Sequence, residues 1–438
     1  MSLQELSEKI SGKTATIAVI GLGYVGLPLA ACLADVGFMV LGVDRKQERV
    51  AVINQGKNPI GGKEPGLDEL LKKTVSAHYL QATTDYQQLR NCDVVFINVE
   101  TPVEEDHKPS YQALRSVLKA LGPVLKKGAL VIVESTISPG TMKNIVLPDL
   151  EKSADGKLGH DFYLGNCPER VMPGRLLANI HSMQRVIGGA DEQTAQTMAL
   201  IYKQFVNADL DLTDWVTAEL VKTVENAYRD VQIAFANEIA ILCADLGADV
   251  WKVRELVNKT PYRNVHKPGA GVGGHCIPKD PWLLASSLSE SKELSLIPAA
   301  RAINDSMPEH VFTLLEKGLS TLGKMLKDSR ILILGYAYLE NSDDDRNSPS
   351  ELFARRLMDG GCSFSIHDPF IERYQGDIYH MAKDCDALVL MTAHDQYRDL
   401  DLKIMRQVMR TPLIIDGRNA FADLTDLHGF EIICLGKG

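Results

Sequence analysis

The alternation of apolar runs with helical stretches predicts two α/β halves of the same kind. Each run is short and almost free of polar residues, as expected for strands of a parallel sheet that is covered on both faces. We place the strands of the first half at residues 15–20, 39–43, 94–99, 130–133, 162–165 and 185–187. We place those of the second half at residues 331–334, 364–367, 388–391, 413–415 and 431–434.

A long helix is predicted between the two halves. From Asp214 to Leu246 the chain has no Gly or Pro, and Gly247 supplies a stop signal. At about 1.5 Å per residue this helix spans roughly 50 Å, more than one domain needs. We therefore expect it to bridge domains and to pair with its copy in a homodimer.

The first predicted strand runs into a dinucleotide-binding fingerprint, Gly-Leu-Gly-Tyr-Val-Gly at 21–26, and a helix at 27–36 follows. In this motif Gly21 makes the turn, Gly23 lets a pyrophosphate approach and Gly26 lets helix pack on strand. Asp44 ends the second strand, where a carboxylate bonds the ribose hydroxyls and repels a 2′-phosphate. Together these residues favour NAD over NADP.

Three later strands of this half end in polar residues, at 100–102, 134–136 and 166–170. Ligands of such sheets sit beyond the carboxyl ends of the strands, so these residues are candidates for a site. Each could equally be an ordinary turn former or cap. The second half has only Gly335 after its first strand, which suits a mononucleotide better than a dinucleotide. The predicted fold is thus α/β, with two Rossmann-like doubly wound sheets joined by a long central helix and a helical domain, divided into residues 1–212, 213–318 and 319–438.

The stretch Gly-Val-Gly-Gly-His-Cys-Ile-Pro-Lys-Asp-Pro-Trp at 271–282 places Cys276 on a shaped loop. Glycines allow positive φ and prolines stiffen the exit, with Asp280 as the expected N-cap and Pro281 as the first residue of a helix. A cysteine ahead of a helix N-terminus, beside His275 and Lys279, has surroundings that favour thiolate. A lone cysteine is usually inert and buried. This context instead makes Cys276 a candidate nucleophile.

On the long helix, Lys222, Asn226 and Arg229 fall at i, i+4 and i+7 and form one polar stripe. A solvated stripe, with Glu219 or Glu225 paired to Lys222, is the ordinary explanation. The apolar residues around the stripe also allow it to point into a cleft.

Composition excludes several classes of protein. The net charge of −10 argues against a nucleic-acid surface. Eight cysteines without a CxxC pair argue against a zinc site or a disulfide framework and for a reducing compartment. No apolar run is long enough for a membrane span and no signal peptide opens the chain, so we expect a cytoplasmic protein without membrane partners.

Taken in order, five motifs resemble those of the UDP-glucose and UDP-N-acetylhexosamine 6-dehydrogenase family, across nearly the whole chain. They are the glycine fingerprint, Ser-Thr-x-x-Pro-Gly-Thr at 135–141, Cys-Pro-Glu-Arg at 167–170, Lys222-x-x-x-Asn226, and Gly-Gly-His-Cys-Ile-Pro-Lys-Asp at 273–280. Pro-Glu-Arg-x-x-Pro-Gly and Gly-His-Cys-Ile-Pro resemble the acetamido-sugar branch, because the glucose branch typically has Pro-Glu-Phe and Gly-Ser-Cys. The implied activity is the NAD-dependent, four-electron oxidation of the C6 hydroxyl of a UDP-N-acetylhexosamine to the uronate, which supplies surface polysaccharide precursors.

The resemblance also implies roles for individual residues. The catalytic set is Cys276, Lys222, Asn226, Asp280, Glu169 and Thr136. NAD would be held by Gly21, Gly23, Tyr24, Val25, Gly26, Asp44, Arg45, Thr101, Thr136 and Arg346. The UDP-sugar would be held by Glu169, Arg170, Val171, Lys222, Asn226, Arg229, Arg263, Gly273 and Arg418. No metal is implied.

The chain departs from the family at two positions. Pro173 stands where glucose-type members have a second glutamate, which fits an acetamido substrate. Leu339 stands where many members have a lysine, which removes a phosphate or sugar contact.

Three functional alternatives stay open at this point. UDP-glucose 6-dehydrogenase shares the motifs. A two-electron hydroxyacid-type dehydrogenase shares the first domain, the long helix and the lysine, but needs neither Cys276 nor residues 320–438. A catalytically silent regulator that binds NAD or a nucleotide sugar is the third, and the intact Cys-Lys-Asn-Asp set counts against it.

Overall fold

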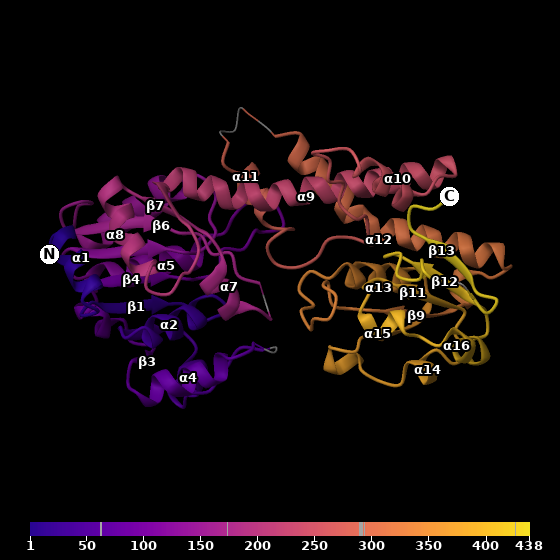
Figure 1. Ribbon diagram of the computed structural model, residues 1–438, viewed down its shortest axis with the longest axis horizontal. Coiled ribbons are helices and arrows are strands. Elements are labelled where there is room, and N and C mark those ends of the chain that lie inside the picture. The colour runs from indigo at the N-terminus through magenta and orange to yellow at the C-terminus, as the bar shows by residue number, and fades with distance from the viewer. Residues whose placement is uncertain (62–63, 173, 289–291, 293, 425) are drawn as a thin grey trace. The chain divides into compact units, whose positions relative to one another are not determined.

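The computed structural model describes residues 1–61, 64–172, 174–288, 292, 294–424 and 426–438. The chain divides into two compact units, residues 1–225 with 282–292 and residues 226–281 with 293–438 (Figure 1). The boundary between them falls within α9 (Trp215–Leu246), which is continuous. None of the helices among the described residues is both long and apolar enough to cross a membrane.

The first unit is built on a sheet with the strand order β3-β2-β1-β4-β5-β6-β7-β8. Its strands are β1 (Thr16–Ile20), β2 (Met39–Val43), β3 (Leu80–Thr83), β4 (Val94–Ile97), β5 (Ala129–Val133), β6 (Phe162–Asn166), β7 (Arg185–Gly189) and β8 (Leu210–Asp214). Its helices are α1 (Leu3–Ser11), α2 (Gly26–Asp35), α3 (Gln47–Asn54), α4 (Leu67–Ser76), α5 (Gln112–Leu121), α6 (Leu147–Ala154), α7 (Leu176–Ser182), α8 (Glu192–Tyr202) and α11 (Asp280–Ala285). Most of α11, from Trp282 onward, belongs to this unit.

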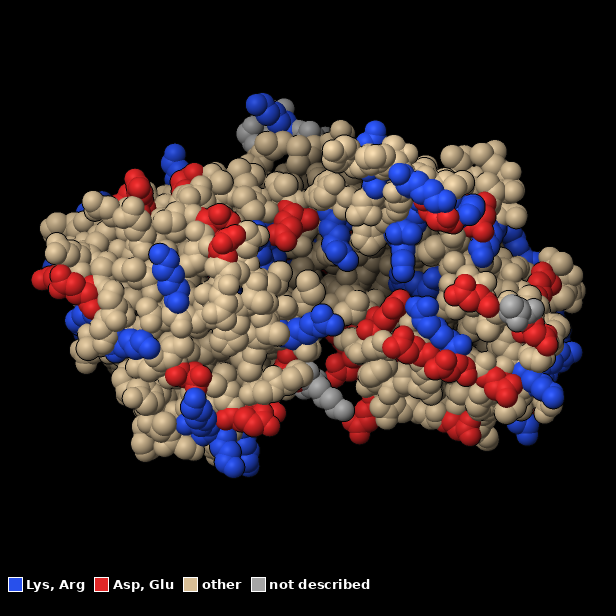
Figure 2. Space-filling model, viewed as in Figure 1, with Lys and Arg blue, Asp and Glu red and all other residues tan. Residues whose placement is uncertain are grey.

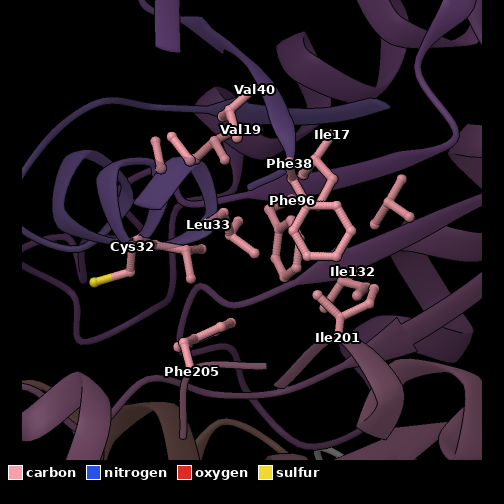
Figure 3. Close-up of a cluster of buried hydrophobic side chains, with 14 of the residues drawn as sticks. Ile17, Val19, Cys32, Leu33, Phe38, Val40, Phe96, Ile132, Ile201 and Phe205 are labelled. Carbon is pink, nitrogen blue, oxygen red and sulfur yellow. The ribbon is translucent and has the colours of Figure 1, made fainter. Parts of the chain in front are cut away.

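Alternate residues of β1 face opposite cores, which is the reason its sequence is apolar throughout. Ile17 and Val19 pack with α1, α2, α4 and α8 in the cluster drawn in Figure 3. Ala18 and Ile20 pack on the other face with α5 and α6. The sheet is therefore doubly wound, as predicted.

The second unit repeats the architecture with the strand order β10-β9-β11-β12-β13, all parallel. Its strands are β9 (Arg330–Leu334), β10 (Ser363–His367), β11 (Ala387–Leu390), β12 (Leu413–Asp416) and β13 (Glu431–Cys434). Its helices are α10 (Val250–Val257), α12 (Leu296–Thr321), α13 (Pro349–Asp359), α14 (Ile378–Met381), α15 (Asp395–Arg398) and α16 (Leu402–Val408), and it also holds most of α9. Ile331 and Ile333 face α12 and α13, whereas Leu332 and Leu334 face α14 and α16.

Every predicted strand is present, with ends that shift by up to two residues. The strands β3 and β8 were not predicted, because their polar residues hide the apolar pattern. The expectation of a parallel sheet is wrong at one place, because β7 runs antiparallel to β6. Among the described residues, the connection between them holds only the short α7, and Arg185 at the start of β7 pairs with Glu169 just after β6. The chain thus stays at the carboxyl end of β6 and must return in the opposite direction.

Each sheet has a carboxylate in the same place, which ties the first strand of that sheet to the strand beside it. Asp93, just before β4, accepts hydrogen bonds from the Thr16 backbone N–H at 3.0 Å and from Lys126 Nζ at 2.6 Å. Asp386, just before β11, accepts in the same way from the Arg330 backbone N–H at 2.9 Å, and Arg410 pairs with it. Burial raises the pKa of both carboxyls, but these bonds outweigh burial and lower the pKa overall.

We predict that Asp93→Ala lowers the free energy of unfolding by about 2 kcal/mol, because the Thr16 N–H and two lysines lose their acceptor. Urea unfolding followed by circular dichroism measures the change. Asp359→Ala, at an exposed position, is the control and should shift stability by no more than about 0.5 kcal/mol. Equal effects from the two substitutions would contradict the assignment.

Candidate active site

The glycine fingerprint adopts the geometry that its sequence predicts. Gly21 follows β1 with φ +90°, and a Cβ there would lie 2.4 Å from the carbonyl oxygen of Asn98. A Cβ on Gly26 would lie 1.9 Å from the Gly21 oxygen, so α2 packs directly on the turn. A Cβ on Gly23 would meet nothing within 4 Å. The space above Gly23 is thus open for a phosphate at the start of α2.

Asp44 lies at the end of β2, buried at the edge of this turn. Its carboxylate accepts from the Leu22 N–H at 3.1 Å, the Lys46 N–H at 2.9 Å and Arg49 Nη1 at 2.8 Å. A carboxylate has about four lone-pair positions, so one acceptor position remains for a ribose hydroxyl. Together with the open space at Gly23, the residues present fit NAD.

The other predicted NAD contacts belong to different parts of the chain. Tyr24 donates its hydroxyl to the Gly61 carbonyl at 3.0 Å, and Val25 directly precedes α2. Arg45 is exposed and pairs with Glu100 at 3.4 Å. Arg346 belongs to the second unit, where Asp344 holds it through two hydrogen bonds of 2.8 and 2.6 Å. Its contact with NAD stays a prediction.

The polar strand exits of the first unit do come together. The Thr101 hydroxyl, after β4, donates to the carbonyl of Thr136, after β5, at 2.6 Å. The Ser135 hydroxyl donates to the Val99 carbonyl at 2.6 Å. After β6, the Glu169 N–H donates to the Glu134 carbonyl at 3.3 Å. The three exits therefore form one connected rim, with Thr136 partly exposed.

A buried charge cluster beneath this rim was not foreseen from the sequence. Arg185 is fully buried and pairs with Glu169, whose other oxygen accepts the Arg170 N–H at 2.7 Å. Tyr202 donates to Glu134 at 2.7 Å, and burial followed by the charge of Glu169 raises the pKa of Glu134 to about 8. Glu169 is thus committed to Arg185, and any role toward substrate must operate from that position. Only the spatial meeting of β5, β6, β7 and α8 reveals the cluster.

Lys222 on α9 is buried and has no ion-pair partner among the residues that the structure describes. The two glutamates suggested for it are engaged elsewhere. Glu219 accepts the N–H groups of Gly140 and Met142, both at 2.7 Å, and Glu225 pairs with Arg170 at 3.1 Å. The interpretation of Lys222 as part of a wet, paired stripe is therefore wrong at this position, although Arg229 on the same stripe is exposed.

Cys276 is exposed, and the other seven cysteines of the chain are buried. It lies in a segment that we call the cysteine loop, residues 269–279. Its carbonyl accepts the N–H groups of Lys279 at 3.1 Å and Asp280 at 2.8 Å. The helix α11 begins at Asp280 itself, one residue earlier than predicted, so Asp280 is its first residue and not its N-cap.

The charges around Cys276 differ from the sequence expectation in one respect. Burial, then the charges of Lys279 and Arg346, lower the pKa of His275 to about 4. His275 is therefore neutral at pH 7 and does not favour thiolate by its charge. Lys279, the last residue of the loop, has its Nζ 3.4 Å from Asp280 Oδ1.

The cysteine loop is anchored along its whole length within the second unit. Asn226 Nδ2 donates to Asp280 Oδ2 at 2.5 Å, which joins two predicted catalytic residues. The Gly274 N–H donates to the Arg346 carbonyl at 2.9 Å. A Cβ on Gly273 would lie 2.5 Å from Tyr338 Cβ, so this glycine is required by packing.

Arg418 lies against the same loop and has only carbonyl acceptors. Its Nε donates to the Met391 carbonyl at 2.7 Å, and its Nη2 lies 3.4 Å from the Gly271 carbonyl. Burial lowers the pKa of Arg418, and no carboxylate pairs with it among the described residues. A guanidinium with no directly paired carboxylate among the described residues is suited to bind a diphosphate.

The remaining predicted substrate residues lie at the surface or at the edge of a core. Arg263, like Arg229, is exposed, and Val171 packs at the edge of the first core. Arg170 Nη1 donates to the Gln184 carbonyl at 3.2 Å. Leu339 is 47% exposed, so this departure from the family leaves an apolar surface where a lysine could reach a ligand. Pro173 lies outside the described residues.

We predict that Gly23→Ala weakens NAD binding at least about tenfold without lowering the thermal midpoint, because its methyl group enters only the open space a phosphate would use. Isothermal titration with NAD measures the affinity. Gly26→Ala is the contrast: its Cβ meets backbone, so this variant should lose thermal stability. Unchanged NAD affinity in Gly23→Ala would contradict the placement of the phosphates.

We predict that Glu134→Gln becomes more stable relative to the parent chain as pH rises from 5 to 8, by at least about 1 kcal/mol. The folded-state pKa of Glu134 is raised, so its contribution is fully present below the unfolded-state value near 4.3 and is lost as pH rises toward 8. Urea unfolding at pH 5 and pH 8 gives the difference. A difference that does not change with pH would show that Glu134 is ionised when buried.

Comparison with known proteins agrees with this geometry. The UDP-glucose/GDP-mannose dehydrogenase family models match in three parts: the NAD-binding domain at residues 15–206, the central domain at 216–306 and the UDP-binding domain at 332–423. A UDP-N-acetyl-D-mannosamine dehydrogenase of Pyrococcus horikoshii is 38% identical over 422 residues, 96% of this chain and 99% of the relative. An NDP-N-acetyl-D-galactosaminuronic acid dehydrogenase of Ralstonia solanacearum is 34% identical over 93% of this chain and 96% of its own length.

A solved structure of a UDP-D-ManNAc dehydrogenase from Pyrococcus horikoshii has a TM-score of 0.91 and 37% identity, covering 97% of this chain and 99% of that one. The family models together cover most of the chain, and the Rossmann-like folds predicted from the sequence are confirmed. The chain belongs to the UDP-glucose/GDP-mannose dehydrogenase family and is a nucleotide-sugar dehydrogenase that uses NAD.

Proposed function

We propose that the protein oxidises the C6 hydroxyl of a UDP-N-acetylhexosamine to the carboxylate, with Cys276 as the covalent nucleophile. The observation that carries the proposal is the exposure of Cys276 on an anchored loop, while the other cysteines are buried. The names of the relatives support an acetamido sugar, and they include both a mannosamine and a galactosamine derivative. The expected product is a uronate for surface polysaccharide synthesis in the cytoplasm.

NAD, when bound, accepts one hydride per molecule, so the removal of four electrons from a primary alcohol requires two molecules in turn. The protein must hold the two-electron product, an aldehyde, between the two oxidations. The Cys276 thiolate adds to the aldehyde carbon as a thiohemiacetal, which becomes a thioester after the second oxidation. Water then releases the uronate and returns the thiol.

The developing oxyanion requires donors. Lys222 is a buried lysine without an ion-pair partner among the described residues, which supports a role as oxyanion donor and proton relay. Asn226 is oriented by its hydrogen bond to Asp280 and serves as the second donor. Asp280 also orients the hydrolytic water. The family resemblance assigns Glu169 and Thr136 to the positioning of that water. Arg185 holds Glu169 in place.

The substrate diphosphate is assigned to Arg418, whose guanidinium has only carbonyl partners. Arg170, Val171, Arg229, Arg263 and Gly273 are assigned to the sugar and nucleotide. A homodimer is part of the proposal, because α9 and α10 expose a row of large apolar side chains in the second unit: Phe235, Leu242, Leu246, Leu256 and Val257.

We predict that the parent chain forms two NADH per UDP-N-acetylhexosamine and that Cys276→Ser forms no uronate. A hydroxyl at this position is a far weaker nucleophile than a thiolate, so a loss of at least about 10³-fold in uronate formation is expected. Absorbance of NADH with a panel of UDP-N-acetylmannosamine, -glucosamine, -galactosamine and UDP-glucose measures the stoichiometry and the substrate. Cys243→Ser, at a buried position, is the control. A normal uronate yield from Cys276→Ser would exclude the covalent scheme, and one NADH per product would indicate a two-electron dehydrogenase.

A further inference from the structure

A chain of buried hydrogen bonds links α9 and α12 to the first residue of the cysteine loop, all within the second unit. Asp230 on α9 and Arg301 on α12 are both almost fully buried, with Nη1 and Oδ1 2.5 Å apart. Asn304 Nδ2 donates to the same Oδ1 at 2.8 Å. Asn237 Nδ2 donates to Asn304 Oδ1 at 2.9 Å, and Asn237 Oδ1 accepts the Gly269 N–H at 2.9 Å.

The turn of α12 that carries Asn304 also approaches the cysteine loop directly. Pro308 lies in the interior of α12 and has no N–H, so the Asn304 carbonyl loses its helical donor there. A Cβ on Gly271 would lie 3.3 Å from Pro308 Cδ and 2.9 Å from Pro349 Cβ. The loop therefore runs in a slot whose walls are set by α12 and α13.

Stability does not account for this network. Asp230 Oδ2 and Arg301 Nε have no hydrogen-bond partner among the described residues, although both groups are buried. Burial raises the pKa of Asp230 in spite of Arg301 and Asn304. Buried ion pairs of this kind can often be replaced by apolar side chains with no loss of stability, or with a gain. What the network does is fix the Gly269 backbone relative to two helices.

Cys276 lies between two such anchors. Asn226 holds Asp280, four residues after Cys276, and Asn237 holds Gly269, seven residues before it. Covalent catalysis is sensitive to small errors in the position of the attacking atom, since about 1 Å can cost roughly 10²-fold in rate. Loss of one anchor leaves the loop attached but free to shift along its slot.

We propose that Asp230, Arg301, Asn304 and Asn237 are positioning residues that set the direction of the Cys276 thiol through Gly269. The proposal rests on the role of Cys276 as nucleophile given above. The hydrogen bonds of these side chains run among themselves, to Asp305 and to the Gly269 backbone, so they act on the thiol through the cysteine loop.

The test is the double variant Asp230→Leu/Arg301→Met, which removes the charges and keeps an apolar core. We expect kcat to fall at least about tenfold, KM for NAD to stay within about twofold, and the thermal midpoint to be equal or higher. We also expect the rate at which iodoacetamide alkylates Cys276, located by peptide mass spectrometry, to change at least about threefold, because the thiol is redirected. Asn237→Ala, which breaks only the last link, should show the same fall in kcat and the same change in alkylation rate, and it serves if the double variant does not fold. Its thermal midpoint should fall, because the Gly269 N–H loses its acceptor.

The matched control is Asp386→Asn, which alters another buried carboxylate of the same unit. Asp386 pairs with Arg410 and Lys324, and it makes no contact with the cysteine loop among the described residues. It should lower the thermal midpoint and keep kcat and the alkylation rate. If the network variants keep the parent kcat and alkylation rate, the proposal is wrong. If the parent chain forms no uronate from any UDP-sugar, the proposed function fails, and the alkylation rate alone then decides whether the network positions the thiol.

Discussion

The hydrogen bond from Asn226 to Asp280 fixes the end of the cysteine loop, and the proposed chemistry depends on it. It joins α9 to the first residue of α11, and α11 begins directly after the cysteine loop. A loop rich in glycine has many accessible conformations, so an exposed thiol on it would otherwise have no defined position. Polar anchors at 269, 274 and 280 remove that freedom while leaving the sulfur accessible. The protein thus combines a rigid loop with one exposed cysteine.

Both units use one structural solution, a doubly wound sheet whose first strand ends in a glycine with positive φ. In the first unit, α2 begins five residues after that glycine. In the second unit, Gly335 is followed by a loop that leads to α13, and Asp368 accepts the N–H groups of Tyr336 and Ala337. Asp368 also accepts from Phe370 and His394, so it has no acceptor left for a ribose. This agrees with the family match, in which the dinucleotide belongs to the first unit and the nucleotide sugar to the second.

The chain is acidic overall, and its binding cations are set apart by their local surroundings. On the face shown in Figure 2, acidic and basic side chains are interspersed. The cations expected to meet phosphate or a developing oxyanion differ from the surface ones, because Lys222 and Arg418 have no carboxylate partner among the described residues. Lys222 is also buried. Removing a cation from water without a directly paired carboxylate costs free energy, which an anionic ligand can offset.

From the sequence alone, most of the elements and all of the motifs could be determined. Short apolar runs predicted every strand except β3 and β8, Gly247 ends α9, and the glycine fingerprint placed the NAD-binding turn, since these features depend on neighbours along the chain. The sequence also singled out Cys276, because glycine and proline shape a loop locally. Partners distant in sequence were decided only by the tertiary structure. The pairing of Glu169 with Arg185, the reversal of β7, the neutral state of His275 and the contact of Asn237 with Gly269 all depend on burial and on which elements meet. Neither the burial of a residue nor the element that it meets is encoded in any short stretch of residues.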